Sequence, residues 1–269
     1  MTITLQHFPA CEHGFHRAPV LLTGASEAIL VDGGFTLGDG RRVAEAIRAT
    51  GKRLTTIYVS QSDPDYYFSL GPVREAFPEA RVIAAEATVA AIRNNVQKKL
   101  EVWGPKLGEN GPQSLADVVI PEASDVRTLL LDGEELQIVD AEGLANRRYL
   151  WAPSLRAVFG GVLVFSGVHV WIADTSTPEA RKAWIANLDA LAAREPRAVV
   201  PGHMQEGAAT DASAIAYTRE YLVRFEEELA KAADSAELVA AMKRHYPDAG
   251  MGIALDIGAK VAKGEMKWG

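Results

Sequence analysis

The sequence contains one cysteine, Cys11, among its 269 residues. A single thiol excludes an intrachain disulfide framework and a zinc cluster built on several thiolates, and it fits a reducing compartment. No apolar run approaches the roughly 20 residues that a membrane helix needs. The N-terminal residues also lack the basic segment and the apolar segment of a signal peptide. We therefore expect a cytoplasmic protein with no membrane partner.

The chain also lacks an excess of positive charge. It has 28 Lys and Arg against 35 Asp and Glu, a formal net charge of −7, so no general basic field is available to hold a nucleic acid. Hydrophobic residues make up 48% and charged residues 23%, which is ordinary globular composition and excludes a disordered chain. We expect a small-molecule substrate as the partner and leave a homodimer open.

Hydrophobic patterning predicts an alternation of strands and helices. Short apolar or alternating runs predict strands at 2–8, 19–24, 28–34, 54–60, 81–85, 128–131, 135–140, 147–153, 157–165 and 197–203. Three- and four-residue spacing predicts helices at 41–50, 71–77, 85–103, 177–195, 214–232, 235–246 and 253–263. This order predicts an α/β, four-layer αββα sandwich with two mixed sheets face to face and helices outside. We expect one domain over 1–269, with 209–269 as a helical C-terminal extension.

Polar residues stand where several of these strands end. Asp32 ends the strand in AILVDGG, the loop QSDPDY follows the next strand, and His203 ends RAVVPGH. This order of strands, with polar residues and turns at their ends, resembles the metallo-β-lactamase superfamily over roughly residues 1–210. In that family an Asp ends the strand before the first helix, an HxHxDH loop follows the next strand, and a later His is the last metal ligand. The resemblance implies the αββα fold and a hydrolase-like activity.

The sequence departs from the family at the metal ligands. The three histidine positions of the family's loop hold Gln61, Asp63 and Tyr66, whereas its aspartate is kept as Asp65. Val162 stands in place of the family's metal-bridging Asp. Catalytic zinc sites use mostly neutral imidazoles, and a metal pair needs a bridging carboxylate. Set against the family, these residues imply that the usual two-zinc site is absent, and we expect no cofactor.

The loop QSDPDYY collects carboxylates, an amide and phenols just past a buried strand, where open sheets present their ligand sites. We predict that Asp63, Asp65, Tyr66 and His203 are catalytic. One of the two aspartates would be the base, His203 its acid or base partner, and Tyr66 a donor to a developing oxyanion. The alternative is a solvated turn in which Asp63 caps a helix that begins near Pro64.

A second set of polar residues is assigned to substrate binding. These residues are Gln61, His13, His16, Tyr67 and His169. The N-terminal EHGFH also offers an alternative, in which one of its histidines joins Asp63, Asp65 and His203 to hold a single, weakly bound divalent metal. Among the aromatic residues, Tyr66 and Trp103 are the candidates for lining the cleft, which suggests an apolar and planar ligand.

The sequence therefore predicts a metallo-β-lactamase-fold, hydrolase-like protein without the di-zinc site. Its chemistry would be metal-independent acid and base catalysis on a small ester, lactone or other carbonyl compound, a substrate class taken from the family alone. Two alternatives stay open, a single-metal hydrolase with a relocated site and a non-catalytic ligand-binding pseudoenzyme.

Overall fold

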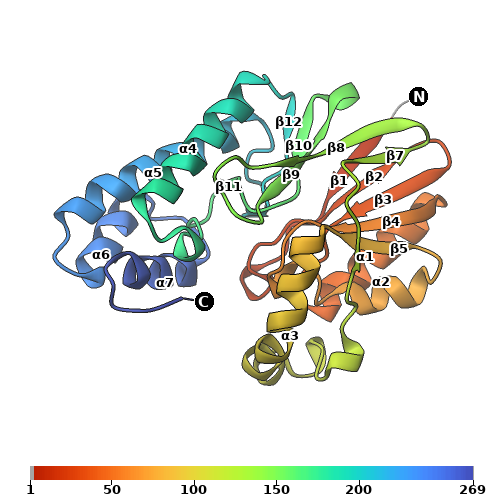
Figure 1. Cartoon of the computed structure of the whole chain (residues 1–269), viewed down its shortest axis with the longest axis horizontal. Helices are drawn as coiled ribbons and strands as arrows, with labels where there is room; N and C mark the ends of the chain where they lie inside the picture. Colours follow the sequence, from red (N-terminus) through yellow and green to blue (C-terminus); the bar gives the residue numbers. More distant parts are fainter. Residues whose placement is uncertain (1–2, 269) are drawn as a thin grey trace.

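Two β-sheets packed face to face form the centre of the computed structural model, which describes residues 3–268 (Figure 1). The first sheet has the order β1 (Thr4–His7), β2 (Val20–Thr23), β3 (Glu27–Val31), β4 (Arg53–Val59), β5 (Arg81–Ala84), β6 (Glu122–Ala123). The second has the order β12 (Ala198–Val199), β10 (Ala157–Phe159), β9 (Arg148–Ala152), β8 (Glu134–Asp140), β7 (Thr128–Leu131). A short parallel pair is formed by β11 (Phe165–Ser166) and β13 (His203–Met204).

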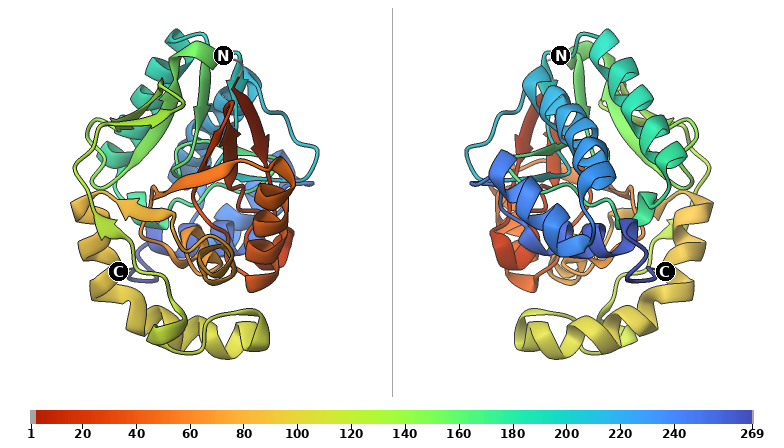
Figure 2. Two further views of the ribbon diagram at one scale, coloured as in Figure 1. Left: turned by 90° about the vertical axis from the view of Figure 1, so that its right-hand side faces the viewer. Right: turned by 90° about the vertical axis from the view of Figure 1, so that its left-hand side faces the viewer.

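Helices cover the outer faces of both sheets (Figure 2). On the side of the first sheet lie α1 (Leu37–Thr50), α2 (Leu70–Ala76) and α3 (Glu86–Leu107). On the other side lie α4 (Pro178–Ala193), α5 (Ala212–Lys231), α6 (Ser235–His245) and α7 (Gly252–Ala262). The predicted αββα sandwich is confirmed. No helix among residues 3–268 combines the length and the apolarity that crossing a bilayer requires.

The alternation of side chains between the two faces of each strand explains why the sheets stack. In β3, Ile29 and Val31 belong to the apolar core between the two sheets, whereas Ala28 and Leu30 pack into the core on the helical side. Side chains of a strand alternate between its two faces, so a strand that is apolar throughout is buried on both. The run AILV therefore specifies a central strand covered by a sheet on one face and by helices on the other.

Two predicted strands are interrupted. The segment 157–165 forms only β10 and β11, because Gly160 and Gly161 between them have φ of 73° and 71°. A Cβ on Gly161 would lie 1.9 Å from the Arg148 carbonyl oxygen, so only glycine fits this turn. The segment 197–203 likewise divides into β12 and β13. The sequence pattern missed both breaks because the flanking residues stay apolar and buried.

Other boundaries shift by a few residues. Helix α3 runs on to Leu107, four residues beyond the predicted end at Trp103, and includes Pro105. The first predicted strand, 2–8, is observed as Thr4–His7, and its residue 2 lies outside the described residues.

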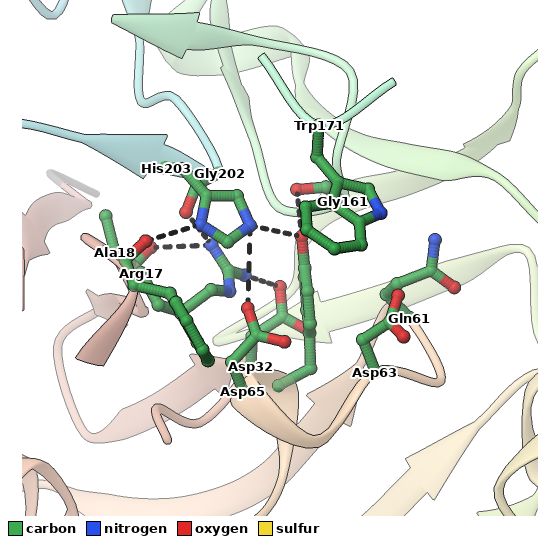
Figure 3. Close-up of polar contacts among 12 residues, drawn as sticks. Arg17, Ala18, Asp32, Gln61, Asp63, Asp65, Gly161, Trp171, Gly202 and His203 are labelled. Atoms are coloured by element: carbon green, nitrogen blue, oxygen red, sulfur yellow. Dashed lines mark hydrogen bonds and ion pairs between the residues drawn. The ribbon is translucent and has the colours of Figure 1, made fainter. Parts of the chain in front are cut away.

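A buried ion pair connects the strand ends of the two sheets (Figure 3). The guanidinium of Arg17 donates to Asp32 Oδ2 and to the carbonyl oxygen of Gly202, and both charged side chains are fully buried. Asp32 also accepts from the Ser60 amide at 2.6 Å and the Ser60 hydroxyl at 2.8 Å. The Ser60 hydroxyl in turn accepts from the Gly161 amide at 2.8 Å. These contacts, called the Arg17–Asp32 clamp below, join β3 and β4 to the loops after β10 and β12.

Replacing Asp32 by Ala should strongly destabilise the fold, because the buried Arg17 would lose its counter-charge. Removing one partner of a buried ion pair costs about 3–5 kcal/mol. We expect the urea midpoint of Asp32→Ala to fall accordingly. The matched control is Arg219→Ala, which breaks the exposed pair with Asp189 (2.6 Å) and should leave the midpoint unchanged. Equal midpoints for Asp32→Ala and wild type would contradict the role of the clamp.

Candidate active site

Four polar side chains line one cavity beside the strand ends. Asp63, Asp65 and Tyr66 come from the loop after β4, and His203 comes from the first residue of β13. The cavity and the open space at its mouth together amount to about 600 Å³. Its other walls are mostly apolar and include Phe15, Trp103, Val162, Trp171, Ile257 and Trp268. All four residues predicted as catalytic therefore share one space, although they are up to 140 positions apart in the chain.

The loop that carries the aspartates is a short 3₁₀ turn. Pro64 begins the turn Pro64–Tyr66, and its fixed φ suits that first position. Asp63 stands at the N-cap position, but its side chain makes no capping hydrogen bond. Its Oδ1 lies instead 3.5 Å from Lys99 Nζ on α3. The capping role considered for Asp63 is thus wrong, and its carboxylate is free to face the cavity.

His203 is held as a neutral imidazole with a defined tautomer. Its Nδ1 lies 2.8 Å from the carbonyl oxygen of Phe15, which can only accept, so Nδ1 carries the proton. Its ring stacks on Phe165 with centroids 5.1 Å apart. Burial, with the nearby charge of Arg17, lowers the pKa of His203 to about 3. The lone pair of Nε2 is therefore available as an acceptor at neutral pH.

Asp65 faces that acceptor. Its Oδ2 lies 3.5 Å from His203 Nε2. Burial, and next the negative charge of Asp63, raise the pKa of Asp65 to about 7. Burial also raises the pKa of Asp63, with Asp174 adding to the effect and Lys99 opposing it. Asp65 thus changes its protonation state near neutral pH, next to an imidazole that does not.

Tyr66 completes the polar end of the cavity. Its hydroxyl lies 3.2 Å from the Gly161 carbonyl oxygen and 3.3 Å from His203 Nε2. The Arg17 guanidinium stacks on its ring at 3.9 Å from the centroid. Burial raises the pKa of Tyr66 well above its ordinary value, so the phenol stays protonated and can only be a hydrogen-bond donor or neutral acceptor. The clamp therefore fixes both Tyr66 and the loop that carries it.

The five residues predicted to bind substrate do not line this cavity. Gln61 is buried and its amide oxygen accepts from the Ser62 backbone at 2.8 Å. Tyr67 is buried in the core that lies under the helices. His169 pairs with the Tyr221 hydroxyl at 2.9 Å, among buried aromatic rings. These three side chains serve packing and local hydrogen bonding.

The N-terminal histidines also point elsewhere. His13 is exposed in a short 3₁₀ turn, Glu12–Gly14. His16 is buried, and its Nε2 pairs with Glu12 Oε2 at 2.7 Å. The left-handed backbone at His16, with φ of 53°, turns the chain at this point. The alternative metal set of Asp63, Asp65, His203 and one of these histidines is therefore not assembled.

Several residues of the site were not assigned to it from the sequence, and four of them matter for its chemistry or shape. Lys99, Trp171 and Trp268 line the cavity, and Arg17 lies beneath it. Lys99 sits on the same helix as Trp103, one turn earlier, so the helical spacing could have indicated it. Trp268 stands sixty-five residues after His203 and carries no local signal. Arg17 lies just before β2 in a segment without a recognisable motif, and only its burial against Asp32 shows its role.

The residues at the family's metal positions do not fit a zinc pair. The Gln61 amide oxygen is turned to the Ser62 backbone, and Val162 presents methyl groups to the cavity. A guanidinium, Arg17, lies against Tyr66 and opposes a positive charge on His203. Within residues 3–268 no group of three His, Cys, Asp or Glu side chains is arranged to hold a metal ion. Two carboxylates, one imidazole and a neighbouring cation are a poor set for two divalent ions.

Comparison with known proteins agrees with the fold. The family model described as the metallo-beta-lactamase superfamily matches residues 18–203. A metallo-beta-lactamase family protein from Thermus thermophilus is 19% identical, with a TM-score of 0.61 over 94% of this chain and 91% of that one. A metallo-beta-lactamase from Pontibacter korlensis is 17% identical, with a TM-score of 0.54 over 82% and 94%. No match is found among curated proteins.

Asp65→Asn should stabilise the protein at alkaline pH. The pKa of Asp65 rises from 3.8 to about 7 on folding. Its contribution to the free energy of unfolding is therefore fully present below pH 3.8, where the carboxyl group is protonated, and is lost as the pH rises through about 7. At about pH 8 the variant should therefore exceed wild type in its free energy of unfolding by up to about 4 kcal/mol, and near pH 4 by nothing. Urea unfolding at several pH values measures this difference.

The same experiment tests His203, whose pKa falls from 6.5 to about 3 on folding. Its stabilising effect is present above pH 6.5 and is lost as the pH falls toward 3, opposite in sign to Asp65. Once Asn replaces Asp65, the free energy of unfolding should rise with pH between these two values. A difference between variant and wild type that stays constant with pH would refute the pKa of Asp65.

Proposed function

The chain belongs to the metallo-β-lactamase superfamily, and from this premise we propose that it is a hydrolase-like enzyme that uses Asp65 instead of a zinc pair. Its substrate would be a small ester, lactone or other carbonyl compound. The observation that carries the proposal is the Asp65 carboxyl group, with a pKa of about 7, 3.5 Å from a neutral His203 in an apolar cavity. A group that titrates near the working pH is suited to both taking up and giving back a proton.

In the proposed reaction, the Asp65 carboxylate removes a proton from water as the water oxygen attacks the substrate carbonyl carbon. The carbonyl π electrons move to oxygen, and the Tyr66 hydroxyl donates a hydrogen bond to that oxyanion. When the oxyanion reforms the carbonyl, the bond from carbon to the leaving oxygen breaks. Asp65 returns its proton to the leaving oxygen, so the carboxylate is regenerated and one water is consumed.

His203 would act as a positioning residue for this proton. Its Nε2, 3.5 Å from Asp65 Oδ2, would accept from the protonated Asp65, whereas its Nδ1 is fixed on the Phe15 carbonyl. Asp63 is less suited to the role, since Lys99 lies 3.5 Å from its carboxylate and favours the charged form. Environments that differ between two neighbouring carboxylates are a common way to divide acid and base roles.

Hydrolysis of p-nitrophenyl acetate and δ-valerolactone by EDTA-treated protein tests the proposal. We expect turnover without added metal. We expect Asp65→Asn to lower kcat by about 10²–10⁴-fold, the usual contribution of general acid–base catalysis. The matched control is Asp189→Asn, whose exposed carboxylate lies outside the cavity, and it should keep full activity. Activity that appears only after adding Zn, Mn or Fe, or that survives in Asp65→Asn, would reject the proposal.

The pH profile gives a second test. Because the carboxylate form of Asp65 is the base, kcat/KM should rise about tenfold per pH unit below pH 7 and level off above it. His203, with a pKa of about 3, should add no limb to the profile above pH 4. A profile that falls between about pH 5 and pH 7 would assign the reaction to the protonated acid instead.

A further inference from the structure

The C-terminal segment forms one wall of the cavity. Met251, Ile253 and Ile257 line it from the start and the middle of α7, and Trp268 lines it from beyond the end of that helix. The match to the family ends at residue 203, so this wall is built by residues outside the matched part. Figure 1 shows the segment that follows α7 running toward the side of the molecule that carries α3.

Two tryptophans that line the cavity are held by one carboxylate. Asp174 accepts from Trp171 Nε1 at 3.0 Å through Oδ2 and from Trp268 Nε1 at 2.8 Å through Oδ1. The two rings meet edge to face, with centroids 5.1 Å apart and planes at 73°. Since both indole donors are satisfied by the same side chain, the rings are fixed relative to each other, and both contribute surface to the cavity.

The carboxylate of Asp174 is itself positioned by a buried arginine, Arg147. Arg147 is buried, with its guanidinium 4.7 Å above the ring of Trp184. Its terminal nitrogens make no hydrogen bond, and its nearest acidic oxygen is Asp174 Oδ2 at 3.7 Å. A buried cation without hydrogen bonds needs a nearby negative charge. Arg147 thus pairs with the same carboxylate that accepts from the two indoles.

Two further aromatic rings line the cavity. Phe15 and Trp103 meet edge to face, with centroids 5.3 Å apart. Lys99, one turn before Trp103 on α3, has its Nζ 5.7 Å from the Trp268 ring centroid and 3.5 Å from Asp63. The cavity lining therefore combines four aromatic residues, Phe15, Trp103, Trp171 and Trp268, with the carboxyl groups of Asp63 and Asp65. This lining suits a ligand with a flat apolar part that packs on the rings and a polar carbonyl directed at Asp65.

We propose that Trp171 and Trp268 are specificity-determining residues that select substrates with a flat aromatic group, with Trp268 supplied by the C-terminal tail. The proposal rests on the proposed function for the reaction, but binding of an aromatic carbonyl compound does not require turnover. Trp268 is 38% exposed and lies outside every helix and strand, beyond the end of α7, so its replacement should leave the fold intact. It is therefore the residue to change.

Calorimetric titration with 2-acetonaphthone, a ketone that cannot be hydrolysed, tests the proposal. Cyclohexyl methyl ketone is the probe that is apolar without being flat. We expect wild type to prefer the naphthyl ketone and Trp268→Ala to bind it about tenfold more weakly, with a much smaller change for the cyclohexyl ketone. Trp268→Phe should recover part of the preference. The control is Met266→Ala, which changes an exposed apolar residue of the same tail outside the cavity and should bind as wild type.

Three outcomes would overturn the proposal: no binding of 2-acetonaphthone by wild type, equal affinity for both ketones, or an unchanged preference in Trp268→Ala. The failure of the proposed function looks different. Aromatic preference without hydrolysis of any ester would refute the reaction and leave the pocket assignment standing. Hydrolysis with no loss of aromatic preference in Trp268→Ala would refute the pocket assignment and leave the reaction standing.

Discussion

The buried pair of Arg17 and Asp32 is the interaction on which the site depends. Neither charge has contact with water, so each relies on the other and on fixed dipoles from Ser60 and Gly202. Such a pair adds little net stability by itself, but it allows one arrangement of the strand ends and penalises others. Because Arg17 also stacks on the Tyr66 ring, the clamp fixes the floor of the cavity as well as the junction of the sheets.

Burial is the main cause of the shifted pKa values of His203 and Asp65, and the charge of Arg17 acts on both groups. The guanidinium adds to the effect of burial in opposing protonation of His203, and it partly offsets the effect of burial on Asp65. The cavity is left with a neutral imidazole, a carboxyl group that titrates near neutrality and a phenol that keeps its proton. A metal-free site can carry out acid and base chemistry with such groups, whereas two divalent ions next to a guanidinium would need more negative ligands than these.

Much of the fold could be predicted from the sequence. Apolar alternation identified the strands and three-to-four spacing the helices, and the order of elements gave the αββα layers, as the structure and the comparisons confirm. The predicted group of Asp63, Asp65, Tyr66 and His203 does share one cavity, because strand ends of packed sheets meet at one edge. The breaks at Gly160 and Gly161 were missed, since what forbids a side chain at Gly161 is a carbonyl oxygen from another strand.

The sequence by itself determined the layers and the strand ends that carry the polar loop. These are local properties, set by side-chain type and spacing. Only the tertiary structure decided which polar residues face the cavity, because burial and hydrogen-bond partners depend on distant segments: His16 and His169 turn to Glu12 and Tyr221. The tertiary structure also placed Arg17 against the ring of Tyr66 and Trp268 against Trp171. These contacts join residues far apart in the chain, so no local sequence pattern encodes them.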